Sequence, residues 1–337
     1  MRRVLRTASP AFFILIFTLF SLAALPACRN QSHIRILKLA HGLDVTHPVH
    51  LAMVHMGEVI SEVSAGQMRI EIHPGGQLGE ERELIEMLQI GSLAMTKVSA
   101  SPLESFVPEI KVFSIPYLFR DYDHLWQVLD GEIGRSLLLA GQDYYLRGLC
   151  YYDAGPRSFY TRDRPIRTPS DLVGLKIRVQ KSITSTRMVQ ALGGSATPID
   201  YGELYSALQQ GVVDGAENNP PSFHVSRHYE VCRYYSLDEH TWVPDILLIS
   251  TKVWESLSSQ EQAWLTEAVK ASVDVQRRLW QEASERSLAE VEAAGVEIIR
   301  PDIDLFRVAV TEMHEGYTGT PIHTLIEEIK AVGYDGG

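Results

Sequence analysis

The sequence predicts an α/β protein of two lobes with a long helix near the C-terminus. Short β-rich runs alternate with helical segments, which is typical of sheets covered by helices. The alternation occurs in two blocks, at about 34–152 and 153–240. A pattern of helical period then continues for about 35 residues. A chain of 337 residues is long enough to build two hydrophobic cores.

In the first block, Ile34, Ile36 and Leu39 alternate with polar neighbours, which indicates a half-buried strand at 34–41. Further strands are expected at 68–73, 93–98 and 144–152, and the Pro74-Gly75-Gly76 turn closes the first of these three. Helices are expected over about 16 residues after His47-Pro48, at 80–90 and at 121–139. This block therefore supplies strands and helices for one lobe.

In the second block, strands are expected at 175–179, 196–199 and 212–216, with helices at 182–192 and 202–210. Strand–helix alternation of this kind indicates mostly parallel sheets. This block predicts the second lobe.

The long helix is expected at 259–294, where Gly295 supplies a stop signal. At 1.5 Å per residue it would be close to 50 Å long, more than one small lobe can cover. We therefore expect it to lie along both lobes. The alternative is a coiled-coil dimerisation helix, but the apolar positions do not keep a strict heptad.

Residues 1–28 have the pattern of a secretory signal peptide. Arg2, Arg3 and Arg6 precede an uncharged apolar run at 11–25, which is shorter than the roughly 20 residues of a membrane-spanning helix. The alternative is an uncleaved membrane anchor. Cys28 lies where the lipidated cysteine of a bacterial lipoprotein would lie, although Pro26 departs from the usual motif. The mature domain is therefore expected in the periplasm, either free or lipid-anchored through Cys28.

Charge and cysteine content narrow the function. Loss of residues 1–27 removes three arginines and no acid, so the formal charge changes from −11 to −14. Such an acidic protein is not expected to bind nucleic acid, which is held by Lys and Arg. Cys150 and Cys232 lie in apolar segments and are expected to be buried thiols, with a disulfide as the alternative.

Enzyme and metal signatures are absent from the sequence. It contains no G-x-S-x-G, P-loop or G-x-G-x-x-G motif, so no catalytic residue and no cofactor is predicted. His50 and His55 are five residues apart, which does not place both imidazoles on one helix face. No Cys or Asp cluster completes a tetrahedral set with the histidines at 33–55, so no metal site is predicted.

The segment 155–219 carries the most information about function. Arg178 stands between Ile177 and Val179 in a short apolar strand, and a buried guanidinium needs a partner. Its planar fork fits a carboxylate with two parallel hydrogen bonds. The alternative is an internal salt bridge to Glu217 or Asp214.

Two runs in this segment, Gly174-Leu175-Lys176-Ile177-Arg178-Val179 and Asp214-Gly215-Ala216-Glu217-Asn218, resemble the solute-binding subunits of TRAP transporters, the DctP-like family. The resemblance extends from about residue 34 to the long helix. It implies the two-lobed periplasmic binding protein fold, in which two lobes close over one ligand. Lobe I is expected at 29–154 with a returning segment at about 244–283, and lobe II at 155–243 with a returning segment at about 284–337.

The resemblance also implies roles for individual residues. Arg178 matches the arginine that pairs with the ligand carboxylate, and Arg157 matches a second basic position. The remaining predicted ligand-binding residues are Asn218, Glu217, Tyr201, Glu80, Glu81, Ser99 and His41.

The segments 217–219 and 237–241 look most like family members that bind uronic acids such as glucuronate or galacturonate. A C4-dicarboxylate, a keto acid or a sialic acid remains the alternative ligand, and the expected partners are the TRAP membrane subunits. A hydrolase or lyase using Glu81 and Glu217, and a binding subunit for a sensor kinase, are the alternative functions.

Overall fold

The computed structural model describes residues 34–333, and the predicted leader with Cys28 lies outside this range. The described residues form one compact unit with two β-sheets. None of the helices in this range is both long and apolar enough to cross a membrane.

The five-stranded sheet has the order β2-β1-β3-β10-β4. Its strands are β1 (Arg35–Ala40), β2 (Met68–His73), β3 (Met95–Ser99), β4 (Leu146–Tyr152) and β10 (Asp245–Ser250). The first three strands run parallel, as predicted, whereas β10 runs antiparallel to both β3 and β4. The sheet is mixed because β10, which comes after most strands of the second sheet along the chain, enters it in the opposite direction.

The six-stranded sheet has the order β11-β9-β5-β8-β6-β7. Its strands are β5 (Pro156–Thr161), β6 (Lys176–Val179), β7 (Ser195–Pro198), β8 (Gly215–Asn218), β9 (Tyr234–Trp242) and β11 (Glu297–Ile299). Strands β6, β7 and β8 are parallel, and β5 is antiparallel to both of its neighbours. Two short connections, β4 to β5 and β9 to β10, join the two sheets.

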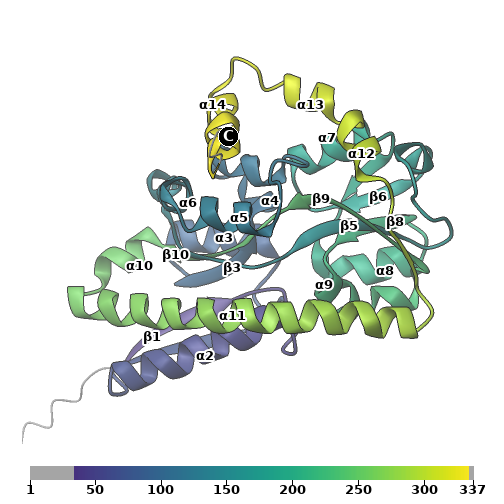
Figure 1. Cartoon of the computed structure of the whole chain (residues 1–337). Helices are drawn as coiled ribbons and strands as arrows, with labels where there is room; N and C mark the ends of the chain where they lie inside the picture. The colour runs from purple at the N-terminus through teal and green to yellow at the C-terminus, as the bar shows by residue number, and fades with distance from the viewer. Residues whose placement is uncertain (1–33, 334–337) are drawn as a thin grey trace, which may run out of the picture. The chain divides into compact units, whose positions relative to one another are not determined.

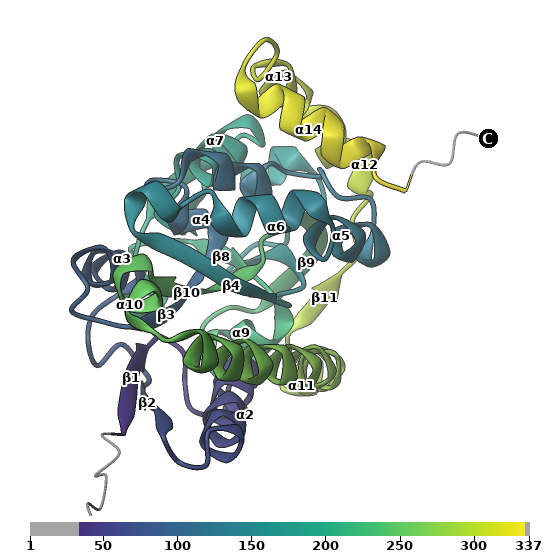
Figure 2. The same cartoon turned by 90° about the vertical axis from the view of Figure 1, so that its left-hand side faces the viewer.

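Both faces of the five-stranded sheet are buried. On β10, Ile246 and Leu248 pack in the same core as α5 (Tyr122–Leu129) and α6 (Glu132–Leu139). Leu247 and Ile249 pack in another core with α2 (Pro48–Val63) and α11 (Ser259–Ala293). This is the period of two of a strand covered on both faces. Figure 2 shows α5 and α6 on one side of β4 and α2 and α11 on the other.

The long helix α11 contacts elements of both sheets, as its length predicted. It packs against α2 and β4, and also against α9 (Pro220–Val225). Figure 1 shows α11 beside both α2 and α9. Ser258 and Glu261 form a capping box at its N-terminus. Near its middle, Gln276 hydrogen-bonds both backbone groups of Asp153, in the connection between β4 and β5.

The prediction of a single helix at 121–139 was wrong, because the chain breaks between α5 and α6. Gly131 has an extended backbone with ψ of −168°, which interrupts the helical hydrogen bonds. In addition, a Cβ atom on Gly134 would lie 2.0 Å from the Leu129 carbonyl oxygen. Only glycine allows the two helices to approach so closely.

The remaining helices cover the sheets and close the chain. They are α3 (Glu81–Ile90), α4 (Ala100–Leu103), α7 (Ile183–Ala191), α8 (Leu204–Gln209), α10 (Thr251–Ser256), α12 (Ile303–Ala309), α13 (Thr311–Glu315) and α14 (Pro321–Ala331). The expectation of buried thiols is confirmed, since Cys150 and Cys232 are both buried and free. They belong to different hydrophobic cores.

Candidate ligand-binding site

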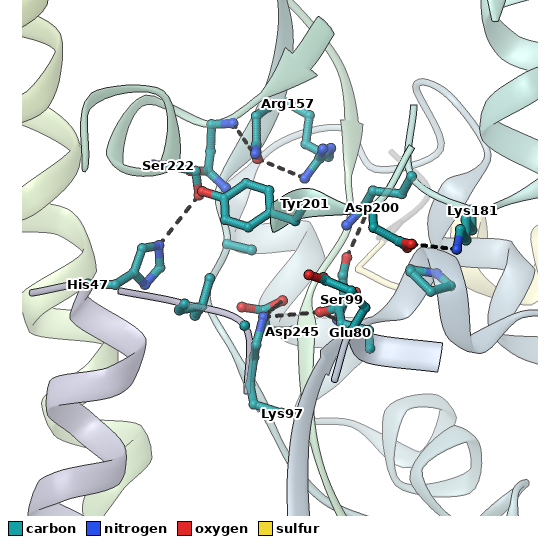
Figure 3. Close-up of a pocket in the computed structure, with 18 of the residues that line it drawn as sticks. His47, Glu80, Lys97, Ser99, Arg157, Lys181, Asp200, Tyr201, Ser222 and Asp245 are labelled. Atoms are coloured by element: carbon teal, nitrogen blue, oxygen red, sulfur yellow. Dashed lines mark hydrogen bonds and ion pairs between the residues drawn. The ribbon is translucent and has the colours of Figure 1, made fainter. Parts of the chain in front are cut away.

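A pocket lies between the two sheets, with one wall from each. Its empty volume is about 740 Å³, part of which is open to solvent. Lys97 and Ser99 of β3 and Asp245 of β10 line one wall, and Arg157 of β5 and Arg178 of β6 line the other. Figure 3 shows Arg157 across the pocket from Lys97 and Asp245.

The structure brings most of the predicted site residues to this pocket. Those that line it are Glu80, Glu81, Ser99, Arg157, Arg178, Tyr201 and Asn218. Glu217 and His41 do not line it. The residues that line it but were missed by sequence reasoning include His47, Lys97, Gln180, Lys181, Asp200, Asn219, Ser222, Asp245 and Trp280.

Arg178 is almost completely buried, with 2% of its surface exposed, yet it has no ionic partner among the described residues. Its Nε donates to the Ile199 carbonyl oxygen at 2.8 Å, whereas its buried Nη1 has no hydrogen-bond partner. The salt bridges considered as alternatives do not form. Burial lowers the pKa of Arg178. A buried cation that lacks a counter-ion is costly, so this pocket is suited to an anion.

Arg157 is different, because its charge is already neutralised. Its Nε and Nη2 both bond the carboxylate of Glu217, the latter at 3.0 Å, and Nη2 also donates to the Glu217 carbonyl oxygen. Of the two predicted arginines, only Arg178 therefore brings to the pocket a charge that no described carboxylate neutralises. Since Glu217 is buried and bound by Arg157, it is also not placed as an acid or base for hydrolysis.

Asn218 depends on Arg157 for its orientation. Its Oδ1 accepts from Arg157 Nη1 at 2.9 Å and from the backbone N–H of Asn219 at 2.9 Å. Both bonds use the amide oxygen, so the Nδ2 hydrogens remain available as donors toward the pocket, which Asn218 lines.

A chain of buried charges extends behind Glu217. His240 Nε2 lies 3.6 Å from Glu217, and His240 Nδ1 lies 2.8 Å from Asp238. Burial alone would lower the pKa of His240, but Asp238 and Glu217 together raise it to about 9. The charges along Arg157, Glu217, His240 and Asp238 therefore alternate in sign. This arrangement holds Arg157 and Glu217 in place.

We expect His240 to make the stability of the protein fall at alkaline pH. Its pKa in the folded state is above the ordinary 6.5, so its contribution is complete below pH 6.5 and is lost as the pH rises through about 9. At 1.36 kcal/mol per pKa unit, the loss amounts to about 3 kcal/mol. Urea unfolding at a series of pH values measures it, with His240→Gln as the comparison. Parallel pH curves for the two proteins would contradict this assignment.

His41, His47 and His50, in the N-terminal part of the described chain, form packing and capping contacts. His41 Nε2 lies 3.0 Å from His50 Nδ1, and burial with the nearby Lys97 lowers the pKa of His41 to about 2. His41 does not line the pocket, and its ring is engaged by His50 and by the N–H of Leu43. In the part of the chain that the structure describes, no three His, Cys, Asp or Glu side chains gather as metal ligands would.

Hydrogen bonds connect the two walls at several points around the pocket. Ser99 Oγ lies 3.2 Å from Gln180 Oε1, and His47 Nε2 lies 3.4 Å from Ser222 Oγ. The N–H of Thr184, in the first turn of α7, donates to Glu104 Oε1 at 3.0 Å. These bonds join β3, α2 and the end of α4 to elements around the six-stranded sheet, so they hold the two walls together.

Fold and site together define an α/β binding protein whose pocket lies between two sheets. The model of the family described as bacterial extracellular solute-binding protein, family 7 (DctP), matches residues 39–319. The chain belongs to this family. The family consists of binding proteins and not of enzymes.

Relatives and solved structures agree with this assignment. An uncharacterized protein of Salmonella typhimurium, YiiZ, is 38% identical over 85% of this chain and 88% of its own length. A TRAP periplasmic solute-binding protein from Bradyrhizobium, crystallised with galacturonate, is 41% identical with a TM-score of 0.85, covering 88% of this chain and 99% of that one. Another from Pseudomonas putida, with bound D-glucuronate, is 37% identical with a TM-score of 0.85, covering 88% and 97%.

Proposed function

We propose that this protein is the exported solute-binding subunit of a TRAP transporter and that it captures a uronic acid, glucuronate or galacturonate. The observation that carries the proposal is the buried guanidinium of Arg178, which lines the pocket without a counter-ion. A ligand carboxylate would supply that counter-ion and accept two parallel hydrogen bonds. The uronates held by the two similar solved structures support this ligand class.

The rest of the lining suits the hydroxyl groups of a sugar ring. Each hydroxyl donates one hydrogen bond and accepts others, so it needs donors and acceptors close together. The pocket offers the acceptors Glu80, Glu81 and Asp245 beside the donor Lys97, and the amide of Asn218 beside the other wall. Trp280 and Tyr201 supply flat apolar surface.

Capture would proceed by closure of the two lobes over the ligand. The carboxylate docks on Arg178 in the open cleft, and the hydrogen bonds that connect β3, α2 and α4 to the opposite wall then form. The closed form would be the one that the membrane subunits recognise. The connections at 152–156 and 242–245 between the sheets are the expected hinges.

The N-terminal pattern supports export. We propose that residues 1–27 are removed as a signal peptide and that the protein acts in the periplasm, either free or anchored by a lipid on Cys28. Mass spectrometry of the protein from membrane and periplasmic fractions distinguishes the two forms by the mass of the acyl groups.

A ligand screen by thermal shift and isothermal titration tests the function. We expect D-glucuronate or D-galacturonate to bind, and at a hundred times its Kd to add about 2.7 kcal/mol to the free energy of unfolding. D-Glucose, which lacks the carboxylate, should not bind measurably. Binding of succinate, a 2-oxo acid or N-acetylneuraminate in place of both uronates would contradict the proposed ligand. Binding of none of these acids would contradict the proposed class.

A further inference from the structure

A charged cluster of Glu81, Lys97 and Asp245 lies on the wall of the five-stranded sheet. Lys97 Nζ lies 3.1 Å from Asp245 Oδ1 and 3.4 Å from Glu81 Oε1, and Glu81 Oε1 also accepts from the N–H of Ser99 at 2.9 Å. All three charged side chains line the pocket, and Lys97 is only 3% exposed. Like Arg178, Lys97 is a cation within a strand that is otherwise buried and largely apolar.

The cluster holds two carboxylates for one ammonium group. Burial alone would lower the pKa of Lys97, but Asp245 and Glu81 raise it, so the lysine is held in its charged form. The adjacent residue Glu80 also lines the pocket, and its carboxylate accepts a hydrogen bond from the N–H of Gly202. Acids therefore outnumber bases on this wall. Arg82, which also lines the pocket, is half exposed and paired with Glu86.

The opposite wall has the reverse character. Arg157 and Glu217 neutralise each other there, and Arg178 remains as an uncompensated positive charge. The two walls come from different sheets, so a ligand that spans the pocket meets a cation at one end and excess carboxylate at the other. Like charges brought together inside a closed site are unfavourable, because little water screens them.

We propose that the Glu81–Lys97–Asp245 cluster restricts the ligand to a single carboxylate, so that this protein takes polyhydroxy monoacids and rejects the corresponding diacids. This inference rests on the proposed function, in which Arg178 binds the one carboxylate. Hydroxyl groups fit the cluster because each can donate to Glu81 or Asp245 and accept from Lys97. A second carboxylate can only accept, and it would find Lys97 already engaged by two acids.

Paired ligands and one isosteric substitution test the proposal. The affinities of D-glucuronate and its diacid counterpart D-glucarate are measured by isothermal titration for the wild-type protein and for Glu81→Gln. The glutamine keeps an acceptor for the Ser99 N–H, and Asp245 remains as the partner of Lys97, so folding should be preserved. Asp245→Asn is the second variant. Glu83→Gln, on the exposed side of α3, changes the net charge equally outside the pocket.

We expect the wild-type protein and Glu83→Gln to prefer glucuronate over glucarate by on the order of a hundredfold. In Glu81→Gln and Asp245→Asn that ratio should fall by about tenfold, mainly through tighter binding of glucarate. Because the same two acids are compared in each protein, the difference between a ring ligand and an open-chain ligand contributes equally to every ratio. It therefore cancels when the ratios of two proteins are compared. A ratio that is unchanged in both pocket variants overturns the inference while the proposed function stands. Failure of the wild-type protein to bind either acid overturns both.

Discussion

Replacement of Arg178 by alanine is expected to weaken the binding of D-glucuronate by on the order of a hundredfold or more. Truncation of one member of a desolvated charge pair costs about 2–5 kcal/mol, and each 1.4 kcal/mol is a factor of about ten in Kd. Arg178→Lys should also bind weakly, because an ammonium group does not reproduce the planar fork. Isothermal titration measures both variants.

Stability separates this effect from simple misfolding. The guanidinium of Arg178 has no counter-ion among the described residues, so its removal should leave the free energy of unfolding, measured without added ligand, unchanged or raise it. Arg300→Ala, at an exposed position, is the matched control and should keep wild-type affinity. Affinity within threefold of wild type in Arg178→Ala would contradict the assignment of the carboxylate site.

The second large effect is expected from the buried pair behind the pocket. Glu217→Gln leaves Arg157 buried without a counter-ion, and the loss of one member of such a pair costs about 3–5 kcal/mol of folding free energy. The low pKa of Glu217, held at about 2 mainly by Arg157 against the effect of burial, shows how strongly the folded protein favours the ionised carboxylate. Urea unfolding at pH 7 measures the loss.

Two further variants show whether the pair itself is responsible. The double variant Arg157→Met/Glu217→Leu removes both charges and should recover much of the stability, because neither member of the pair is left buried without the other. Glu203→Gln, at an exposed position between β7 and α8, should have the same free energy of unfolding as the wild-type protein. If Glu217→Gln were as stable as this control, the pair would not hold the pocket wall as described.

Local sequence patterns predicted the elements that are determined locally. The apolar alternation at 34–41 and the Pro-Gly-Gly turn after 73 place β1 and β2 within one residue. The capping box at Ser258 and the stop signal at Gly295 mark the two ends of the long helix. The break at Gly131 could not be predicted from the local pattern, because glycine is tolerated within a helical pattern. Its extended backbone depends on the close packing of α5 against α6.

Contacts between distant parts of the chain decide the rest, and a sequence alone does not contain them. An arginine within an apolar strand indicated a functional position, and Arg178 does line the pocket. The same argument applies to Lys97, which lies in the buried strand β3. Asp245 is 148 positions from Lys97 along the chain, and only the antiparallel pairing of β3 with β10 brings them together. The lobe boundaries and the ligand contacts of individual residues stay predictions.

The most direct test of the account removes the charge from the ligand and from the protein in turn. Affinities of D-glucuronate and its neutral amide, D-glucuronamide, are measured by isothermal titration for the wild-type protein and for Arg178→Ala. If the carboxylate sits on Arg178, the wild-type protein should prefer the acid by on the order of a hundredfold, and the variant should bind acid and amide about equally. An equal preference for the acid in both proteins would show that the carboxylate binds elsewhere.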